Sequence, residues 1–143
     1  MFFLKELPTE IMLNKYTSDL TNDEKNSIIE ALRIMRQASL LIRSIETYFS
    51  AHDLSQLRFL ILIVIDREPN RSSLYPHEIA SRLDVSRPVL TRTLKSLIED
   101  GLLTSSNDET DKRAKKITLT KKGITCLSKV IPGYFNEINK LME

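Results

Sequence analysis

The residues with the clearest chemical capacity are the basic and hydroxyl side chains between Ser86 and Asp100. Arg and Lys side chains bind phosphates and base edges in DNA, and Ser and Thr hydroxyls bind either. The candidate contact residues in this stretch are Ser86, Arg87, Pro88, Val89, Thr91, Arg92 and Lys95. On a helix they lie opposite an apolar stripe of Leu90, Leu94, Leu97 and Ile98. Such a helix is suited to the major groove of DNA, and a solvated amphipathic helix is the alternative.

Other kinds of chemistry have no support in the sequence. His52 and His77 have no Ser or Cys nucleophile in a recognisable motif nearby, and neither a Gly-rich phosphate loop nor a paired-carboxylate signature is present. Their spacing does not suit a metal ion. Cys126 is the single cysteine, which excludes an internal disulfide and indicates a buried, inert thiol in a reducing compartment such as the cytoplasm. We therefore expect no enzyme, no metal and no cofactor.

Two short helices are expected to position the basic face. Ser86 is a good N-cap, Pro88 fits the first turn, and Gly101 is a typical C-terminal stop. A preceding helix is expected to begin at Pro76, and the turn Asp84-Val85-Ser86 joins it to the basic helix. This arrangement predicts a helix-turn-helix.

A β-hairpin is expected after Gly101. Residues 102–106 and 115–119 can pair as two strands around a polar loop. Leu74-Tyr75 is a candidate short strand. The loop between the long strands and its edge are rich in basic residues, namely Lys112, Arg113, Lys115 and Lys116. Directly after a recognition-type helix, this hairpin is interpreted as a wing whose Arg113 enters a minor groove, with Asp111 orienting that guanidinium by a charge-assisted hydrogen bond.

Long amphipathic helices are expected on both sides. Thr21 and Glu24 form a capping box before a periodic segment that reaches Phe49, about 42 Å if helical throughout. Residues 56–67 are expected to form a buried helix rather than a strand. A last helix follows Thr120, with a kink or break at Pro132-Gly133. The first and last helices are expected to form a dimer interface, although the long one could instead span its own domain.

Length and charge are compatible with this scheme. The 143 residues suffice for one compact unit, with an N-terminal arm and dimerisation helix over 1–53, a DNA-binding domain over 54–120 and a dimerisation helix over 121–143. Residues 1–20 are weakly specified, either an arm or a fraying terminus. The net charge is only +2, but residues 71–122 hold eleven Lys or Arg against seven Asp or Glu. The longest apolar run, 59–65, is too short for a bilayer.

The residues of the central region resemble the MarR family of winged-helix transcriptional regulators. The resemblance lies in three runs, which are residues 78–92, the Asp111-Lys112-Arg113 wing signature, and Leu119-Thr120 with Gly123. It implies a mostly α fold with a small β-hairpin wing, a winged helix-turn-helix with N- and C-terminal dimerisation helices. Asp84 departs from the Gly that is usual in the turn, where Asp tolerates a left-handed backbone.

The resemblance also implies a function. We expect a homodimeric, sequence-specific regulator of transcription, a repressor, that binds a pseudo-palindromic double-stranded DNA operator and no membrane. Small, often phenolic or anionic, molecules would bind between the dimer helices and the DNA-binding lobe. Peroxide sensing by an N-terminal cysteine is not expected, because Cys126 is the only one. The alternative is a winged-helix module that binds another protein.

Overall fold

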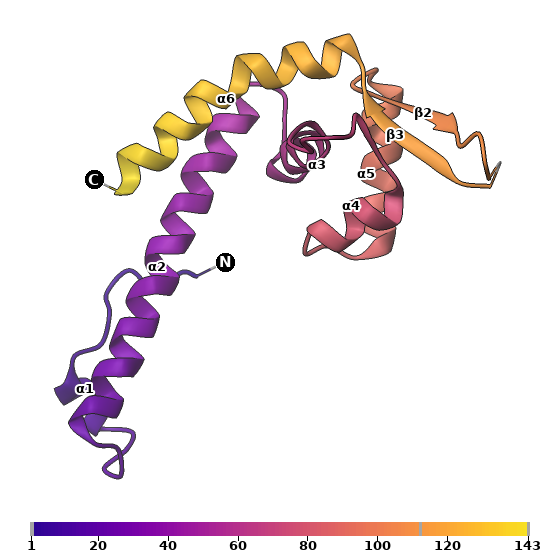
Figure 1. Cartoon of the computed structure of the whole chain (residues 1–143). Coiled ribbons are helices and arrows are strands. Elements are labelled where there is room, and N and C mark those ends of the chain that lie inside the picture. The colour runs from indigo at the N-terminus through magenta and orange to yellow at the C-terminus, as the bar shows by residue number, and fades with distance from the viewer. Residues whose placement is uncertain (1, 112, 143) are drawn as a thin grey trace. The chain divides into compact units, whose positions relative to one another are not determined.

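The computed structural model describes residues 2–111 and 113–142, which form six helices and three short strands (Figure 1). The chain divides into two compact units, Met1–Ile45 and Glu46–Glu143. Helix α2 (Asn22–Ser50) begins in the first unit and ends in the second. The predicted division into dimerisation segments (1–53 and 121–143) and a DNA-binding domain (54–120) assigns functional roles, and it stays a prediction.

The first unit consists of α1 (Glu10–Asn14), most of α2 and the segment that precedes them. The predicted capping box is confirmed, since Thr21 N–H donates to Glu24 at 3.0 Å and Glu24 N–H donates to Thr21 Oγ1 at 3.2 Å. The N-terminal segment is tied to α2 as well. Ser39 Oγ donates to the Phe2 carbonyl at 3.1 Å, and Arg36 donates to the Leu4 carbonyl at 3.0 Å.

Helix α3 (Gln56–Asp66) is the buried spine of the second unit. Ser55 Oγ accepts the Arg58 N–H at 3.1 Å, so the predicted N-cap is confirmed. The fully or almost fully buried residues of this helix are Phe59, Ile61, Leu62, Val64 and Ile65. An apolar run that is compatible with a strand therefore forms a helix, as the cap and the length of the run predict.

The predicted helix-turn-helix is confirmed as α4 (Pro76–Arg82) followed by α5 (Arg87–Glu99). Leu83, the C-cap of α4, is extended at φ −129° and ψ 144°. Of the described residues other than Gly, Asp53 alone has a positive φ. Asp84 therefore does not adopt the left-handed backbone conformation that the family's usual Gly at this position suggested. The turn therefore accepts Asp84 without backbone strain.

The strands form one antiparallel sheet in the order β1-β3-β2. Strands β2 (Leu103–Asn107) and β3 (Lys115–Leu119) make the predicted hairpin, with Leu103 opposite Leu119 and Asn107 opposite Lys115. Strand β1 (Ser73–Leu74) pairs with β3 through Leu74 and Ile117. Leu74, Leu103 and Ile117 are buried, which fixes the base of the hairpin against the core.

Helix α6 (Lys121–Met142) passes through Pro132 without interruption, so of the predicted kink or break, the break is wrong. Pro132 cannot donate a backbone hydrogen bond, but packing on both sides keeps the helix intact. Leu127 and Val130 are buried, and Tyr48 Oη donates to the Val130 carbonyl at 2.7 Å. Tyr134 adds an aromatic contact to Phe59, with ring centroids 4.6 Å apart.

Candidate nucleic-acid interface

Helix α5 is built as the sequence predicts. Ser86 Oγ accepts the Val89 N–H at 3.4 Å, and Gly101 ends the helix with φ +78°. Leu90, Leu94 and Leu97 are buried. Ile98, which was expected in the same stripe, is 37% exposed because it lies at the edge of the stripe in the last turn. The buried side of α5 thus fixes which side chains face outward.

The outward face carries almost all of the predicted contact residues. The exposed ones are Ser86, Arg87, Pro88, Thr91, Arg92 and Lys95. Val89 is half-buried, so it presents only part of its side chain. Within residues 2–111 and 113–142, the charged ends of Arg87, Arg92 and Lys95 have no hydrogen-bond or ion-pair partner. Cations that the fold leaves unpaired are available for phosphates or base edges.

The wing also presents a basic side chain. Arg113 is exposed in the loop between β2 and β3, and Lys112 lies outside the described residues. The Asp111 carboxylate accepts the backbone N–H of Arg113 at 2.9 Å. The sequence predicted that Asp111 would hold the Arg113 guanidinium. The observed bond goes to the backbone instead and shapes the loop. Among the described residues, the Arg113 guanidinium therefore has no ion pair with Asp111, which holds only the Arg113 backbone.

A groove of about 690 Å³ lies between the helix-turn-helix and the wing. Its walls include Arg87 and Thr91 from α5 and Arg113 and Lys115 from the wing. Arg87 of α5 therefore borders the same groove as Arg113 and Lys115 of the wing, whereas Arg92 and Lys95 lie outside its lining. A polyanion that reaches both walls would meet positive charge from each.

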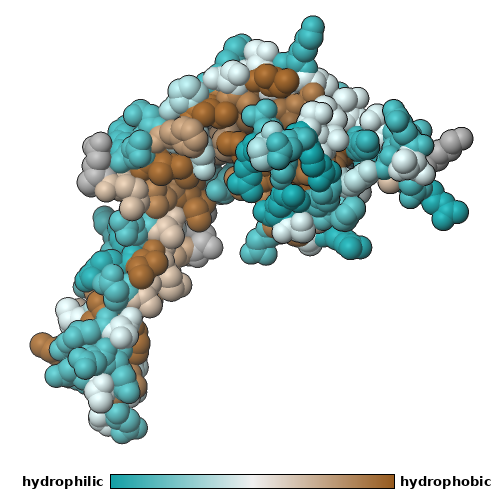
Figure 2. All heavy atoms as spheres, in the orientation of Figure 1, coloured by the Kyte–Doolittle hydropathy of each residue, from teal (hydrophilic) through white to brown (hydrophobic). Residues whose placement is uncertain are grey.

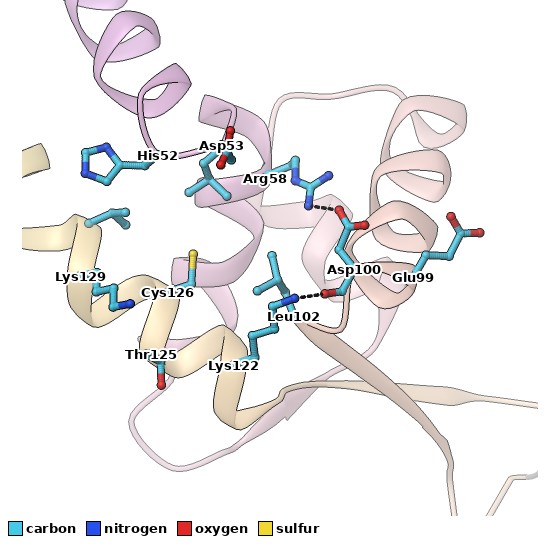
Figure 3. Close-up of a pocket in the computed structure, with 12 residues that line it drawn as sticks. His52, Asp53, Arg58, Glu99, Asp100, Leu102, Lys122, Thr125, Cys126 and Lys129 are labelled. Carbon is cyan, nitrogen blue, oxygen red and sulfur yellow. Dashed lines mark hydrogen bonds and ion pairs between the residues drawn. The ribbon is translucent and has the colours of Figure 1, made fainter.

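A second pocket, of about 800 Å³, lies where the C-terminal end of α5 meets α3 and α6 (Figure 3). Its cations are largely occupied by protein groups. Arg58 donates to Asp100 Oδ2 at 2.6 Å and to Ser96 Oγ at 2.9 Å, and Lys122 donates to the Asp100 carbonyl at 2.8 Å. Ser96 thus turns toward α3 and is not free on the outer face. These bonds fix the end of α5 to the body of the unit.

The histidines and the cysteine have structural surroundings. His52 Nδ1 lies 2.9 Å from the Tyr48 carbonyl oxygen, and the His77 ring stacks on the Tyr75 ring. Cys126 lines the pocket in Figure 3 and is half-buried, less enclosed than expected. The described residues contain no cluster of three or more His, Cys, Asp or Glu that could hold a metal ion.

The junction between the wing and α6 explains the Thr120 and Gly123 pair. Thr120 Oγ1 donates to the Gly101 carbonyl at 2.6 Å and accepts the Gly123 N–H at 3.1 Å. A Cβ on Gly123 would lie 2.2 Å from the Leu102 oxygen. Gly at this position lets α6 start directly against the end of α5.

Sequence reasoning missed the long-range bonds that hold these elements. Arg58 and Asp100 are 42 positions apart, and Tyr75 and Asp108 are 33 apart. Neither pair has a local spacing signal. Among these missed bonds, the one from the Tyr75 N–H to the Glu78 carboxylate spans three residues and follows a capping pattern.

These elements define the class of protein: a helix-turn-helix whose second helix presents an unpaired basic face, followed by a β-hairpin wing, is a winged helix-turn-helix. No helix of the described segments combines the length and the apolar character that crossing a bilayer would require.

Comparison with known proteins identifies the family. The model of the MarR family matches residues 52–114. The HTH-type transcriptional repressor YetL of Bacillus subtilis is 30% identical over 141 residues, which cover 98% of this chain and 83% of YetL. The transcriptional repressor MprA of Escherichia coli is 26% identical over 134 residues, 94% of this chain and 76% of MprA. The chain belongs to the MarR family.

Solved structures share the fold. The MarR family regulator AbsC of Streptomyces coelicolor has a TM-score of 0.73 at 21% identity, over 87% of this chain and 82% of AbsC. Sco3205 of the same organism, solved in complex with DNA, has a TM-score of 0.74 at 20% identity, over 87% of this chain and 77% of Sco3205. The predicted winged-helix fold is therefore confirmed.

Proposed function

We propose that this protein is a homodimeric, sequence-specific repressor of transcription that acts in the cytoplasm. One observation carries the proposal: the exposed cations of α5 have no partner within the described chain, and one of them, Arg87, lines a groove with Arg113 and Lys115 of the wing. Two relatives, YetL and MprA, are both named transcriptional repressors. The proposed contacts are those of Ser86, Arg87, Pro88, Val89, Thr91, Arg92, Lys95, Asp111 and Arg113.

Exposed apolar residues support the dimer. On the part of α2 in the first unit, Ile34, Met35 and Ile42 are 58%, 50% and 42% exposed. On α6, Phe135 and Met142 are 51% and 60% exposed. Figure 2 shows apolar side chains along both helices and hydrophilic ones on the wing. Burial of such residues against a second copy would remove them from water. The proposed dimer requires its two α5 helices to lie about 34–36 Å apart, the spacing of successive major grooves.

The test compares a preferred duplex with a random one. A duplex is selected from a random pool with the full chain, and dissociation constants are measured by fluorescence anisotropy at fixed salt. Arg92→Ala should weaken the selected duplex by about 1–3 kcal/mol, because a bidentate contact to a base is lost, and should weaken the random duplex less. Arg33→Ala is the matched control, since it also removes one cation, but from an ion pair with Glu30 on α2.

Each outcome has a clear meaning. Equal loss on both duplexes for Arg92→Ala means that this residue contacts phosphate and does not read a base. If the wild-type protein binds neither duplex at low salt, the DNA-binding proposal fails and the protein-interaction alternative stands. A small-molecule effector stays a prediction.

A further inference from the structure

One side-chain bond joins the helix-turn-helix to the wing. Tyr75 is the N-cap residue of α4, and its phenol O–H donates a hydrogen bond to Asp108 Oδ2. Asp108 directly follows β2, at the base of the wing loop, and it is 9% exposed. Asp108 is buried and Tyr75 is half-buried, so the bond satisfies a carboxylate oxygen that has little access to water. We refer to this pair as the Tyr75–Asp108 clasp.

On the wing side, Asp108 organises the loop that carries Arg113. Its Oδ1 accepts the Thr110 N–H at 3.1 Å and the Thr110 hydroxyl at 3.0 Å. Its backbone N–H donates to the Ala114 carbonyl at 3.0 Å and so closes the loop. One carboxylate therefore uses one oxygen to shape the wing loop and the other to hold α4.

On the helix side, Tyr75 is itself held in place. Its backbone N–H donates to Glu78 Oε1 at 3.0 Å, and Glu78 is paired with both terminal nitrogens of Arg71, one of them at 2.6 Å. The Tyr75 ring stacks on His77 at a centroid distance of 5.6 Å and an interplanar angle of 9°. The phenol thus starts from a rigid position at the beginning of α4.

The charge states favour the bond at neutral pH. The hydrogen bond from Tyr75 lowers the pKa of Asp108 to about 2, with further donation from Thr110, and the same bond raises the pKa of Tyr75. The donor is therefore a neutral phenol and the acceptor a carboxylate throughout the physiological range. Hydrogen bonds to an ionised acceptor are the stronger kind.

The clasp borders the groove between α5 and the wing. Tyr75 and Asp108 line this groove together with Arg87 of α5 and Arg113 of the wing. A hairpin joined to the body only through its strands can pivot, and a second attachment reduces that freedom. The separation of Arg87 and Arg113 across the groove therefore depends on the bond between Tyr75 and Asp108.

We propose that Tyr75 and Asp108 are positioning residues that hold the wing at the distance from α5 at which Arg87 and Arg113 contact one DNA duplex together. This rests on the proposed function. The clasp lowers the cost of binding, because the wing is ordered before DNA arrives. Neither residue needs to touch DNA for this effect.

The test is a double-mutant cycle in the full-length chain. Tyr75→Phe removes the hydroxyl and keeps the ring, and Arg113→Ala removes the wing cation. Dissociation constants for the selected duplex are measured over a range of salt concentrations. Tyr75→Phe should weaken binding about 3- to 10-fold, the equilibrium equivalent of one hydrogen bond. Because Tyr75 acts through Arg113, the double variant should bind no more weakly than Arg113→Ala alone.

The salt dependence provides a second measurement that loss of stability alone would not change. Both single variants should reduce the slope of log affinity against log salt, since each loses the contact of the wing cation with DNA and the counterions that this contact releases. Tyr16→Phe is the matched control. It removes a hydroxyl from a side chain that is 82% exposed in the first unit, and it should leave affinity and slope unchanged. Far-UV circular dichroism verifies that all variants fold.

A measurement without DNA tests the clasp directly. Amide hydrogen exchange of residues 108–114 should be faster in Tyr75→Phe than in the wild type. Wild-type affinity and exchange in Tyr75→Phe, or fully additive losses in the cycle, would overturn the positioning role while leaving DNA binding intact. If the wild type does not prefer the selected duplex over a random one, the proposed function fails and the positioning role fails with it.

Discussion

Replacing Gly123 by Ala should destabilise the protein, although Ala is the better helix former. A Cβ at this position would lie 2.2 Å from the Leu102 oxygen and 3.2 Å from the Leu102 carbonyl carbon. The oxygen contact falls below 3.0 Å, a distance that real Cβ atoms essentially never show. The first turn of α6 must then move away from Leu102 by about 1 Å, because a packed interior has no room for the extra group.

Opposing effects set the magnitude. Helix propensity favours Ala over Gly by about 1 kcal/mol. Overpacking costs about 1–3 kcal/mol. The displacement also breaks the bonds from Thr120 N–H to the Leu102 carbonyl (3.1 Å) and from Thr120 Oγ1 to the Gly101 carbonyl (2.6 Å). Each is worth about 1 kcal/mol. The net loss in the free energy of unfolding should therefore be about 2–4 kcal/mol.

Urea unfolding followed by far-UV circular dichroism measures this loss. All variants are compared at one protein concentration, because the apparent stability of a dimer depends on it. Ser128→Ala, at an exposed position of the same helix, is the control and should change stability by less than about 0.5 kcal/mol. A urea midpoint for Gly123→Ala equal to or above that of the wild type would refute the steric argument, since helix propensity would then have prevailed.

Other predictions concern the pH dependence of stability and the hydrogen bond from Tyr48 to α6. The bond from Arg71 lowers the pKa of Glu78 to about 2, so its stabilisation is complete above the ordinary Glu value and is lost as pH falls toward 2. The wild-type urea midpoint should fall between about pH 5 and pH 3, and that of Glu78→Gln should fall less; parallel curves would contradict this cause. Tyr48→Phe should cost about 1 kcal/mol, because the bond to the Val130 carbonyl (2.7 Å) is lost. Thermal unfolding beside Tyr16→Phe measures this cost, and an unchanged midpoint would mean that the carbonyl needs no second donor.

Features that depend on neighbours within one turn could be predicted from the sequence. The Thr21 and Glu24 capping box and the Ser86 cap each span three residues, so spacing alone identifies them. The outward position of Arg92 follows from the buried stripe of Leu90 and its neighbours in the same way. For these elements, local geometry and hydrophobic periodicity contain the necessary information.

Features that depend on tertiary packing could not be predicted. Pro132-Gly133 is a local helix breaker, yet α6 continues because Val130 is buried and Tyr48 bonds to its carbonyl. The partner of Asp108 is Tyr75, 33 positions away, and no period in the sequence pairs them. The loop residue Asp111 was expected to hold the Arg113 side chain but bonds to its backbone, a choice that the turn geometry decides.

Cys126 makes this protein convenient for spectroscopy. It is the only cysteine of the chain, it is half-buried on α6, and it lines the pocket beside Lys122 and Lys129. A thiol-reactive nitroxide therefore attaches at one place in each chain without prior removal of other thiols. In a homodimer, the two labels define a single distance, and pulsed electron paramagnetic resonance can compare that distance in free and DNA-bound protein.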